Sequence, residues 1–470
     1  MAKQQMGLVG LAVMGENLAM NMESKGFSVA VFNRTGEKTK AFVAGRAAGK
    51  RIVGTYSPQE LCDALERPRK VFLMVKAGSA VDDMIAQIRP HLEAGDLLID
   101  GGNSYFPDTE RRAADLAKAG LLYIGTGVSG GEEGALKGPC IMPGGSPEAY
   151  ALVKDVLEKM AAQIDGPCCT YIGPRGAGHY VKMVHNGIEY GIMQCIAEVY
   201  DVLQTILRLK AADLSKVFGK WNDAELGGYL MEITTTCLAK VDPDTGKPLV
   251  DVILDKAGQK GTGKWTSQNA LDLGVAIPTI DMAVEGRILS AFKDERVAAA
   301  KVLKGTRAKA PSNRTAFIRN CRDALYLAVI SCYAQGMALM REASKEHQYD
   351  LRLAEIARIW RGGCIIRSKL LDPIAAAYRK NPALANLLVD RNVAKVVNTR
   401  MKGLRTVVGE AVKAGVPVLG LGSAIAYIDS YRSARLPQNL TQAQRDYFGA
   451  HTYERVDKSG VFHTQWAEPS

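Results

Sequence analysis

Five polar side chains within residues 181–191 have the types and the spacing of an acid–base site. Lys182, His185, Asn186, Glu189 and Tyr190 stand at positions i, i+3, i+4, i+7 and i+8, so on a helix they share one face. Partial burial would lower the pKa of the lysine and raise the pKa of the glutamate. These two residues could then act as a general base and a general acid.

The ordinary alternative for this segment is a solvated helix face, which amphipathic helices commonly have. Against it, His, Asn and Tyr are poor choices for a plain exposed helix surface. Gly187 and Gly191 also lie among them, and glycine costs a helix stability. Their small profiles predict that another group approaches this helix closely.

A glycine turn at residues 10–15 has the context of a dinucleotide-binding loop. It follows an apolar run and opens a helical pattern, where a helix N-terminus can hold a pyrophosphate. Gly10 would permit the turn and Gly15 the close packing of helix and strand. Ala12 replaces the middle glycine, so a tight turn of some other α/β protein stays open as the alternative.

The end of the next apolar run indicates which cofactor would bind. An NAD site places Asp or Glu there to hold the ribose 2′-hydroxyl, whereas this chain has Asn33, Arg34 and Thr35. An arginine without an acid suits a 2′-phosphate and therefore NADP. An ordinary surface arginine is the alternative.

Residues 258–264 have the spacing Gly-x-x-x-x-Gly-Lys of a phosphate-binding loop. Trp265 follows where Ser or Thr would have to ligate Mg²⁺, which argues against NTP hydrolysis. With Lys260, Thr262 and Lys264, the loop still makes a good anion cradle. A flexible surface loop is the alternative.

Short apolar runs and helical patterns alternate up to about residue 173, with runs at residues 6–9, 28–32, 71–75, 97–99 and 121–124. This alternation predicts a parallel sheet covered by helices on both faces. From about residue 179 the period is helical, at residues 180–209, 213–221, 279–291, 315–346 and 351–360, so the second half should be mainly helical. The pattern breaks at Pro437, and a polar, aromatic tail without a core of its own follows.

The net charge of the chain indicates what kind of partner it binds. The 470 residues carry 60 Lys and Arg against 49 Asp and Glu, a net charge of +11, which favours anionic partners. Residues 301–322 hold seven basic residues and no acid. A nucleic-acid contact there is possible, but no aromatic platform or helix-turn-helix pattern accompanies it. A solvated basic connector is the stronger interpretation.

Other site classes find little support. The six histidines and nine cysteines show no metal-ligand spacing, so we expect no metal site. An odd number of cysteines without a Cys-x-x-Cys pair is typical of a reduced compartment, and with no signal peptide apparent we expect a cytoplasmic protein. The uncharged stretch 324–340 is short and contains polar residues, which predicts a buried core helix and no membrane span.

Motifs along nearly the whole chain resemble those of the decarboxylating 6-phosphogluconate dehydrogenase family. They lie at residues 10–15, 33–35, 75–78, 101–104, 127–134, 182–190, 260–265 and 445–451, and Ala12 is the family's own pattern. The resemblance implies an α/β Rossmann-type N-terminal domain, a large all-α domain and a docking tail that reaches the partner of a homodimer. We place these parts at residues 1–176, 177–436 and 437–470.

The resemblance also implies an activity, the oxidative decarboxylation of 6-phosphogluconate to ribulose 5-phosphate and CO₂ with reduction of NADP⁺, in the pentose phosphate pathway. Lys182 would be the base and Glu189 the acid. The implied substrate-binding residues are Asn103, Ser129, Gly130, Gly131, His185, Asn186, Tyr190, Lys260, Thr262 and Arg287, with Arg445 and His451 from the partner. The implied cofactor-binding residues are Gly10, Leu11, Ala12, Val13, Met14, Gly15, Asn33, Arg34, Thr35, Val75, Lys76, Ala77 and Asn103.

Two other functions stay open. A related β-hydroxyacid dehydrogenase acting on a small unphosphorylated acid would also use Lys182 and Asn186. It would not need the phosphate-binding residues Lys260, Arg287, Arg445 and His451. A basic, non-catalytic scaffold that binds nucleic acid would instead use residues 301–322.

Overall fold

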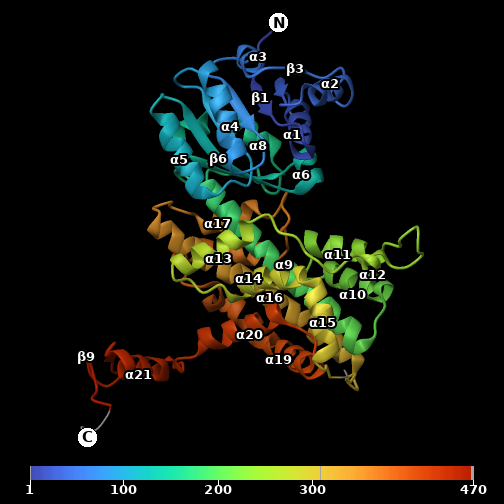
Figure 1. The fold of residues 1–470 in the computed structure, drawn as a ribbon, viewed down its shortest axis with the longest axis vertical. Coiled ribbons are helices and arrows are strands. Elements are labelled where there is room, and N and C mark those ends of the chain that lie inside the picture. The colour runs from blue at the N-terminus through green and yellow to red at the C-terminus, as the bar shows by residue number, and fades with distance from the viewer. Residues whose placement is uncertain (1, 307–308, 467–470) are drawn as a thin grey trace. The chain divides into compact units, whose positions relative to one another are not determined.

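The structure is a computed structural model that describes residues 2–306 and 309–466. The chain forms two compact units, one ending at Ala424 and a second beginning at Ile425. Figure 1 follows both along the chain. The first unit contains a seven-stranded sheet and a large helical part.

The sheet has the strand order β3–β2–β1–β4–β5–β6–β7. The strands are β1 (Met6–Val9), β2 (Val29–Phe32), β3 (Ile52–Thr55), β4 (Lys70–Leu73), β5 (Leu97–Asp100), β6 (Leu122–Ser129) and β7 (Cys140–Gly145). The first six run parallel, and β7 is antiparallel to β6. Because β2 and β4 lie on opposite sides of β1, the topology reverses there, and such a switch point opens a ligand crevice at the carboxyl ends of the strands.

The prediction of a parallel sheet is therefore confirmed for the five predicted strands, β1, β2, β4, β5 and β6. The antiparallel strand β7 had not been predicted. Only residues 130–139 separate β6 from β7, and a parallel crossover needs a dozen or more residues. The chain must turn back, and β7 becomes an antiparallel edge strand. The short strand β3 had also not been predicted.

The parallel strands are mostly apolar because both faces of the sheet are covered. Side chains of β1 and β2 alternate between two cores: Met6 and Val29 lie in one, and Val9 and Ala30 in the other. The first core is completed by α1 (Val13–Ser24), α2 (Gly36–Ala44) and α8 (Lys154–Met160), and the second by α3 (Pro58–Asp63), α4 (Ser79–Ile88) and α5 (Phe106–Ala117). The remaining helices here are η1 (Arg89–His91), α6 (Gly131–Lys137) and α7 (Pro147–Ala151).

The helical part begins with α9 (Ala177–Leu207), which runs from the sheet into the middle of the unit (Figure 1). The predicted helices of the second half are confirmed. The helices that follow α9 are α10 (Ala211–Asp223), α11 (Tyr229–Ala239), α12 (Leu249–Val252), α13 (Thr262–Asp272), α14 (Pro278–Ala291), α15 (Lys293–Val302), α16 (Arg314–Glu346), α17 (Leu353–Ile359), α18 (Leu371–Lys380), η2 (Leu387–Val389), α19 (Arg391–Ala414) and α20 (Leu419–Arg432).

Helix α16 is the one described helix long and apolar enough to cross a membrane by length and composition. Its most apolar window is 89% buried inside the protein, and Ala324, Leu327 and Met340 are fully buried. The predicted core helix at residues 324–340 is confirmed.

The basic segment 301–322 spans the end of α15, a loop and the start of α16; its residues 307 and 308 lie outside the described residues. Two of its arginines make contacts within the protein. Arg314 donates a 2.6 Å hydrogen bond to the Leu207 carbonyl, and Arg322 lies 3.4 Å from the Glu225 carboxylate.

The second unit contains α21 (Gln438–Gly449) and a two-stranded hairpin of β8 (Tyr453–Glu454) and β9 (Val461–Phe462). Among its described residues from 431 to 466, the only buried side chain is that of Asp446. The predicted absence of an apolar core in the tail is confirmed for these residues.

Candidate active site

The first half of α9 carries the predicted polar face into the interior. A Cβ atom on Gly127 of β6 would collide with the Cβ atom of Lys182, so the helix lies directly against the strand. Lys182 is 5% exposed and His185 is fully buried. The alternative of a solvated helix face is therefore wrong.

The two glycines of this face allow close packing on its other sides. A Cβ atom on Gly187 would lie 2.7 Å from the Thr266 side chain of α13, and one on Gly191 would lie 2.6 Å from Cys332 Sγ of α16. The prediction that another group approaches here is confirmed.

A hydrogen-bond chain joins the polar side chains. Lys182 Nζ donates to Asn186 Oδ1 at 2.8 Å, and His185 Nδ1 lies 3.1 Å from the same oxygen. Asn186 Nδ2 donates to Thr262 Oγ1 at 3.2 Å, and Ser129 Oγ lies 3.4 Å from His185 Nε2. Because Asn186 Oδ1 only accepts, His185 Nδ1 carries the proton and Nε2 is left to accept from the serine.

Burial shifts the three titratable groups in directions that suit proton transfer. It lowers the pKa of Lys182, against the opposing effect of Glu189, and it raises the pKa of Glu189, against Lys182 and Arg287. It also holds the pKa of His185 well below its ordinary value, helped by the charge of Lys182. Burial thus favours a neutral amine, a protonated carboxyl group and a neutral imidazole.

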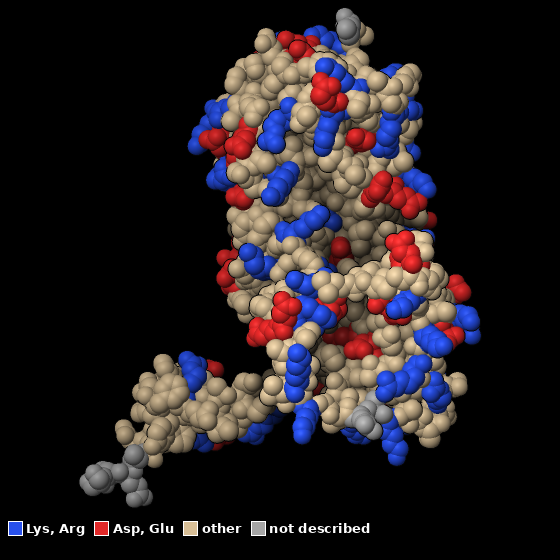
Figure 2. Space-filling model, turned by 45° about the vertical axis from the view of Figure 1, so that its right-hand side comes forward, with Lys and Arg blue, Asp and Glu red and all other residues tan. Residues whose placement is uncertain are grey.

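These groups border a cleft of about 1300 Å³ that is partly open to solvent. Figure 2 shows the surface hollowed between the sheet and the helical part of the first unit, with charged side chains around the hollow. The predicted substrate residues that line the cleft are Asn103, Ser129, Gly130, Gly131, Asn186, Tyr190, Lys260, Thr262 and Arg287. His185 lies behind Ser129 and Asn186 and does not line it.

Two cations give one end of the cleft a positive charge. The guanidinium of Arg287 stacks 3.4 Å above the ring centre of Tyr190 and donates to the Gly258 carbonyl at 3.1 Å. Lys260 lies in the exposed loop before α13. A planar guanidinium held in place by an aromatic ring suits the oxygens of a phosphate.

The loop before α13 shows why its Walker-like spacing does not make a nucleotide-triphosphate site. Trp265 lies inside α13 and packs against Tyr105, with ring centres 5.0 Å apart. The residue that would have to ligate Mg²⁺ is therefore part of an aromatic contact.

Within residues 2–306 and 309–466, no group of three or more His, Cys, Asp or Glu side chains could hold a metal ion.

The glycine turn has the geometry of a close-packed strand–helix corner. Gly10 has φ +97°, which disfavours other residues, and a Cβ atom on Gly15 would collide with the Gly10 carbonyl oxygen. Ala12 has φ −86°, an ordinary value for alanine, which explains why the middle glycine can be replaced. Asn33 Oδ1 accepts a 3.0 Å hydrogen bond from the Leu11 N–H and so joins the turn to the end of β2.

A second cavity, of about 900 Å³, opens at the switch point between β1 and β4. Of the predicted cofactor residues, Gly10, Ala12, Asn33, Arg34, Thr35, Val75 and Lys76 line it. Leu11, Ala12 and Val13 line a neighbouring cavity on the other side of the turn, and Met14 and Asn103 line the cleft. Gly15 is buried beneath the turn, and Ala77 lines none of these cavities.

These residues fit a dinucleotide with a 2′-phosphate. The turn opens helix α1, whose N-terminus can hold a pyrophosphate. Arg34 and Thr35 share the cavity with a further cation, Lys38. Sequence reasoning missed Lys38, which lies in the first turn of α2, the helix that directly follows residues 33–35.

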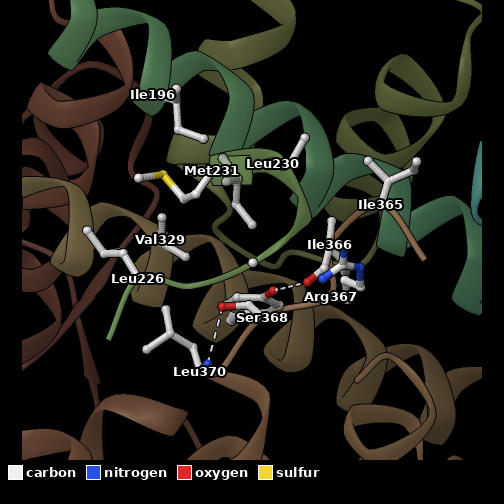
Figure 3. A pocket seen from close by; sticks show the side chains of 13 residues that line it. Ile196, Leu226, Leu230, Met231, Val329, Ile365, Ile366, Arg367, Ser368 and Leu370 are labelled. Atoms are coloured by element: carbon white, nitrogen blue, oxygen red, sulfur yellow. Dashed lines mark hydrogen bonds between the residues drawn. The ribbon is translucent and has the colours of Figure 1, made fainter. Parts of the chain in front are cut away.

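Sequence reasoning also missed Ile365, which lines the cleft from a loop between α17 and α18. The same residue borders a smaller apolar pocket behind the cleft (Figure 3). There the Tyr333 hydroxyl donates to the Ile366 carbonyl at 2.7 Å, and Leu370 N–H donates to Ser368 Oγ at 3.2 Å. These bonds hold the loop from behind, and no local sequence pattern indicates them.

Two predicted substrate residues, Arg445 and His451, belong to the second unit. They are expected to act at the site of a partner subunit, and their role stays a prediction.

Comparison with known proteins covers nearly the whole chain. Residues 5–173 match the family model of the NAD binding domain of 6-phosphogluconate dehydrogenase, and residues 178–466 match that of its C-terminal domain. The NADP(+)-dependent, decarboxylating 6-phosphogluconate dehydrogenase of Bacillus subtilis is 58% identical over 468 residues, which cover 99% of this chain and 100% of that protein. The decarboxylating enzyme of Escherichia coli is 54% identical over 470 residues and covers both chains completely.

A solved structure agrees with these matches. Plasmodium falciparum 6-phosphogluconate dehydrogenase, determined in its apo form and in complexes with NADP⁺ and with 6-phosphogluconate, is 45% identical and superposes with a TM-score of 0.95. The similarity covers 98% of this chain and 100% of the Plasmodium chain. The matches to two family models and to this solved structure together show that the chain belongs to the 6-phosphogluconate dehydrogenase family.

Proposed function

We propose that this protein oxidises 6-phosphogluconate with NADP⁺ and releases ribulose 5-phosphate and CO₂, with Lys182 and Glu189 as the proton-transferring groups. One observation carries the proposal. A buried lysine with a lowered pKa and a glutamate with a raised pKa lie on the same helix face and border one cleft. Perturbed acid and base groups in a cleft are typical of catalytic sites.

In the first step, neutral Lys182 Nζ takes the proton of the substrate C3 hydroxyl. When bound, NADP⁺ supplies the acceptor for the hydride that leaves C3. The oxidised substrate is a β-keto acid, so its C1 carboxylate can leave as CO₂ while the electron pair moves to the C3 oxygen. Protonated Lys182 donates a hydrogen bond to that oxygen as its negative charge develops. It then transfers the proton to the oxygen, which gives the enediol and returns the amine to its neutral form.

The last step needs a general acid. Protonated Glu189 gives its proton to the carbon that carried the carboxylate, and Lys182 takes the proton of the neighbouring enediol hydroxyl, which leaves the ketone product. Glu189 ends ionised and Lys182 ends protonated, so one proton must return to the glutamate and one must leave the lysine before the next cycle.

The other cleft residues bind and orient the substrate. In this proposal Ser129, Gly130 and Gly131 hold the carboxylate, while Asn103, His185 and Asn186 orient the hydroxyl groups. Tyr190, Lys260, Thr262 and Arg287 hold the 6-phosphate, and the stack of Arg287 on Tyr190 supports this assignment. Residues 10–15, 33–35, 75–77 and Asn103 would hold the cofactor.

The proposal includes a homodimer and a three-part chain divided at residues 176 and 436. The tail of one subunit would reach its partner and add Arg445 and His451 to the partner's phosphate site. We place the enzyme in the cytoplasm, where its phosphorylated substrate and cofactor would be found. Nine cysteines without a disulfide support a reducing compartment.

The test is the appearance of NADPH, followed at 340 nm, when the purified protein is mixed with 6-phosphogluconate and NADP⁺ in the presence of EDTA. We expect a robust rate with one CO₂ released per NADPH. No rate with this substrate, together with oxidation of a small unphosphorylated 3-hydroxy acid, would overturn the substrate assignment in favour of a β-hydroxyacid dehydrogenase.

A further inference from the structure

The carboxylate of Asp446 in α21 accepts four hydrogen bonds from other residues of the second unit. Its Oδ1 accepts hydrogen bonds from Thr452 N–H at 3.0 Å and from His463 Nδ1 at 2.9 Å. Its Oδ2 accepts from Thr464 N–H at 3.1 Å and from Trp466 Nε1 at 2.8 Å. One side chain therefore ties the helix to the turn after it and to the segment after the hairpin.

The segment from α21 to Trp466 is held together by this buried carboxylate and has no buried apolar side chains among its described residues. Asp446 is fully buried, whereas Leu440, Tyr447, Phe448 and Val461 of the same unit are each more than half exposed. A buried carboxylate is stable only when its acceptor positions are filled, and here four donors fill them. Burial would raise the pKa of Asp446, but the bonds from His463, Thr464 and Trp466 outweigh it and lower the pKa to about 2.

The same residue fixes the backbone on both sides of His451. Ala450 and Thr452 have φ angles of +49° and +58°, a region that residues with a side chain rarely occupy. The Asp446 carbonyl accepts a 3.0 Å bond from Ala450 N–H, and its carboxylate accepts from Thr452 N–H. Asp446 thus holds the strained turn on both sides of His451, as strained backbone must be held by the structure around it.

Arg445 is joined to this turn as well. Its Nη1 donates to Gln442 Oε1 at 3.0 Å, and Gln442 Nε2 donates to the Thr452 carbonyl at 2.5 Å. Arg445 is therefore joined to Asp446 through the side chain of Gln442 and the backbone of Thr452, and His451 is joined to it through the backbone of its two neighbours.

We propose that Asp446 is a positioning residue that sets Arg445 and His451 in the geometry in which the tail binds the 6-phosphate of the substrate. This inference rests on the proposed function of those two residues. Asp446 itself is buried and does not touch the substrate. It lowers the cost of binding because the tail is already ordered before the phosphate arrives.

The test compares full-length variants with the wild type in steady-state kinetics. Asp446→Asn keeps the shape but places an NH₂ group against two of the four donors. We expect the KM for 6-phosphogluconate to rise at least tenfold, while the Kd for NADP⁺ and the kcat/KM for unphosphorylated gluconate stay within twofold. Asp457→Asn removes an exposed carboxylate of the same unit, paired with Arg455, and should leave all three constants within twofold.

Two further variants distinguish a role of Asp446 in positioning Arg445 and His451 from a general loss of folded structure in the tail. Trp466→Phe removes one donor and keeps the ring, so it should raise the same KM by a smaller factor. Adding Arg445→Ala to Asp446→Asn should raise KM no further than the larger single effect, because both act through one network.

The outcomes distinguish this inference from the function on which it rests. A wild type that does not oxidise 6-phosphogluconate overturns the proposed function. An active wild type with an Asp446→Asn variant that keeps its KM overturns the positioning role alone. Equal losses of kcat/KM for 6-phosphogluconate and gluconate would also overturn it, because they would show a purely structural role.

Discussion

Lys182 Nζ donates a 2.8 Å hydrogen bond to Asn186 Oδ1, one turn further along α9. A neutral amine has one lone pair, and an amide oxygen can only accept, so this bond uses an N–H of the lysine and leaves its lone pair free. Asn186 is held in turn by Thr262 of α13. In the proposed mechanism, this bond therefore holds Lys182 at the cleft and leaves its lone pair free to take the substrate proton.

Replacing Lys182 by methionine should abolish this proton transfer. The side chain keeps its length and loses its amine, so we expect kcat to fall by about 10²- to 10⁴-fold, the range that a positioned acid–base group contributes. NADP⁺ binding, measured by quenching of protein fluorescence, should persist. Lys216→Met, at an exposed lysine of α10, is the matched control and should keep full turnover; unchanged turnover in Lys182→Met would contradict the mechanism.

The pH dependence of kcat should have two limbs. Activity needs neutral Lys182, which is lost as pH falls, and protonated Glu189, which is lost as pH rises. The lowered pKa of the lysine and the raised pKa of the glutamate move both requirements toward neutral pH. We expect a bell-shaped profile of kcat against pH.

Replacing Glu189 by glutamine tests the assignment of these limbs. The variant should lose kcat by about 10²-fold or more because its general acid is gone, and its residual activity should no longer fall at high pH. The remaining rise reports Lys182 alone, and the pKa of the lysine should lie lower than with Glu189 present, since that carboxylate raises it. A profile that still declines at high pH would assign that limb to another group.

The cofactor preference should depend on Arg34. A hydrogen bond from a charged group contributes about 1.5–3 kcal/mol, so Arg34→Asp should shift the ratio of kcat/KM for NADP⁺ over NAD⁺ toward NAD⁺ by about ten- to a hundredfold. Arg89→Asp, at an exposed arginine of the same domain, should leave the ratio unaltered. The same ratio in Arg34→Asp as in the wild type would exclude a contact with the 2′-phosphate.

The close approach of α9 to β6 gives a test of geometry. Gly127→Ala would push its methyl group into Lys182, and a displacement of about 1 Å can cost about 10²-fold in rate. Gly409 in α19 has no neighbour within 4 Å of an added Cβ atom, so Gly409→Ala should keep kcat and raise stability by about 0.5–1 kcal/mol. Equal kcat values in the two variants would show that this packing does not position the lysine.

Much of the fold could be predicted from the sequence because it depends on local periodicity. The apolar runs at β1, β2, β4, β5 and β6 and the helical period of α9 and α16 are visible without any contact between distant residues. The antiparallel edge strand β7 is not, because its direction is decided by the length of the connection from β6. The short strand β3 is missed since its middle residues are only half-buried.

The candidate site divides in the same way. The spacing of Lys182, Asn186 and Glu189 on one face, and the turn at residues 10–15, follow from residue types and helix geometry alone. The burial of that face depends on strand β6 and helices α13 and α16, which pack around it. Burial in turn decides that the pKa of Lys182 is lowered and the pKa of Glu189 is raised.

The residue order thus determined the family, the cofactor class and the shared helix face of Lys182 and Glu189, because sequence motifs, glycine turns and helical spacing are visible in neighbouring residues. Only the tertiary structure decided that Ile365 and Lys38 line the cavities and that Asp446 gathers four donors. These features depend on burial and on hydrogen bonds between residues that are far apart in the sequence or separated by turns, and such contacts exist only once the chain has folded.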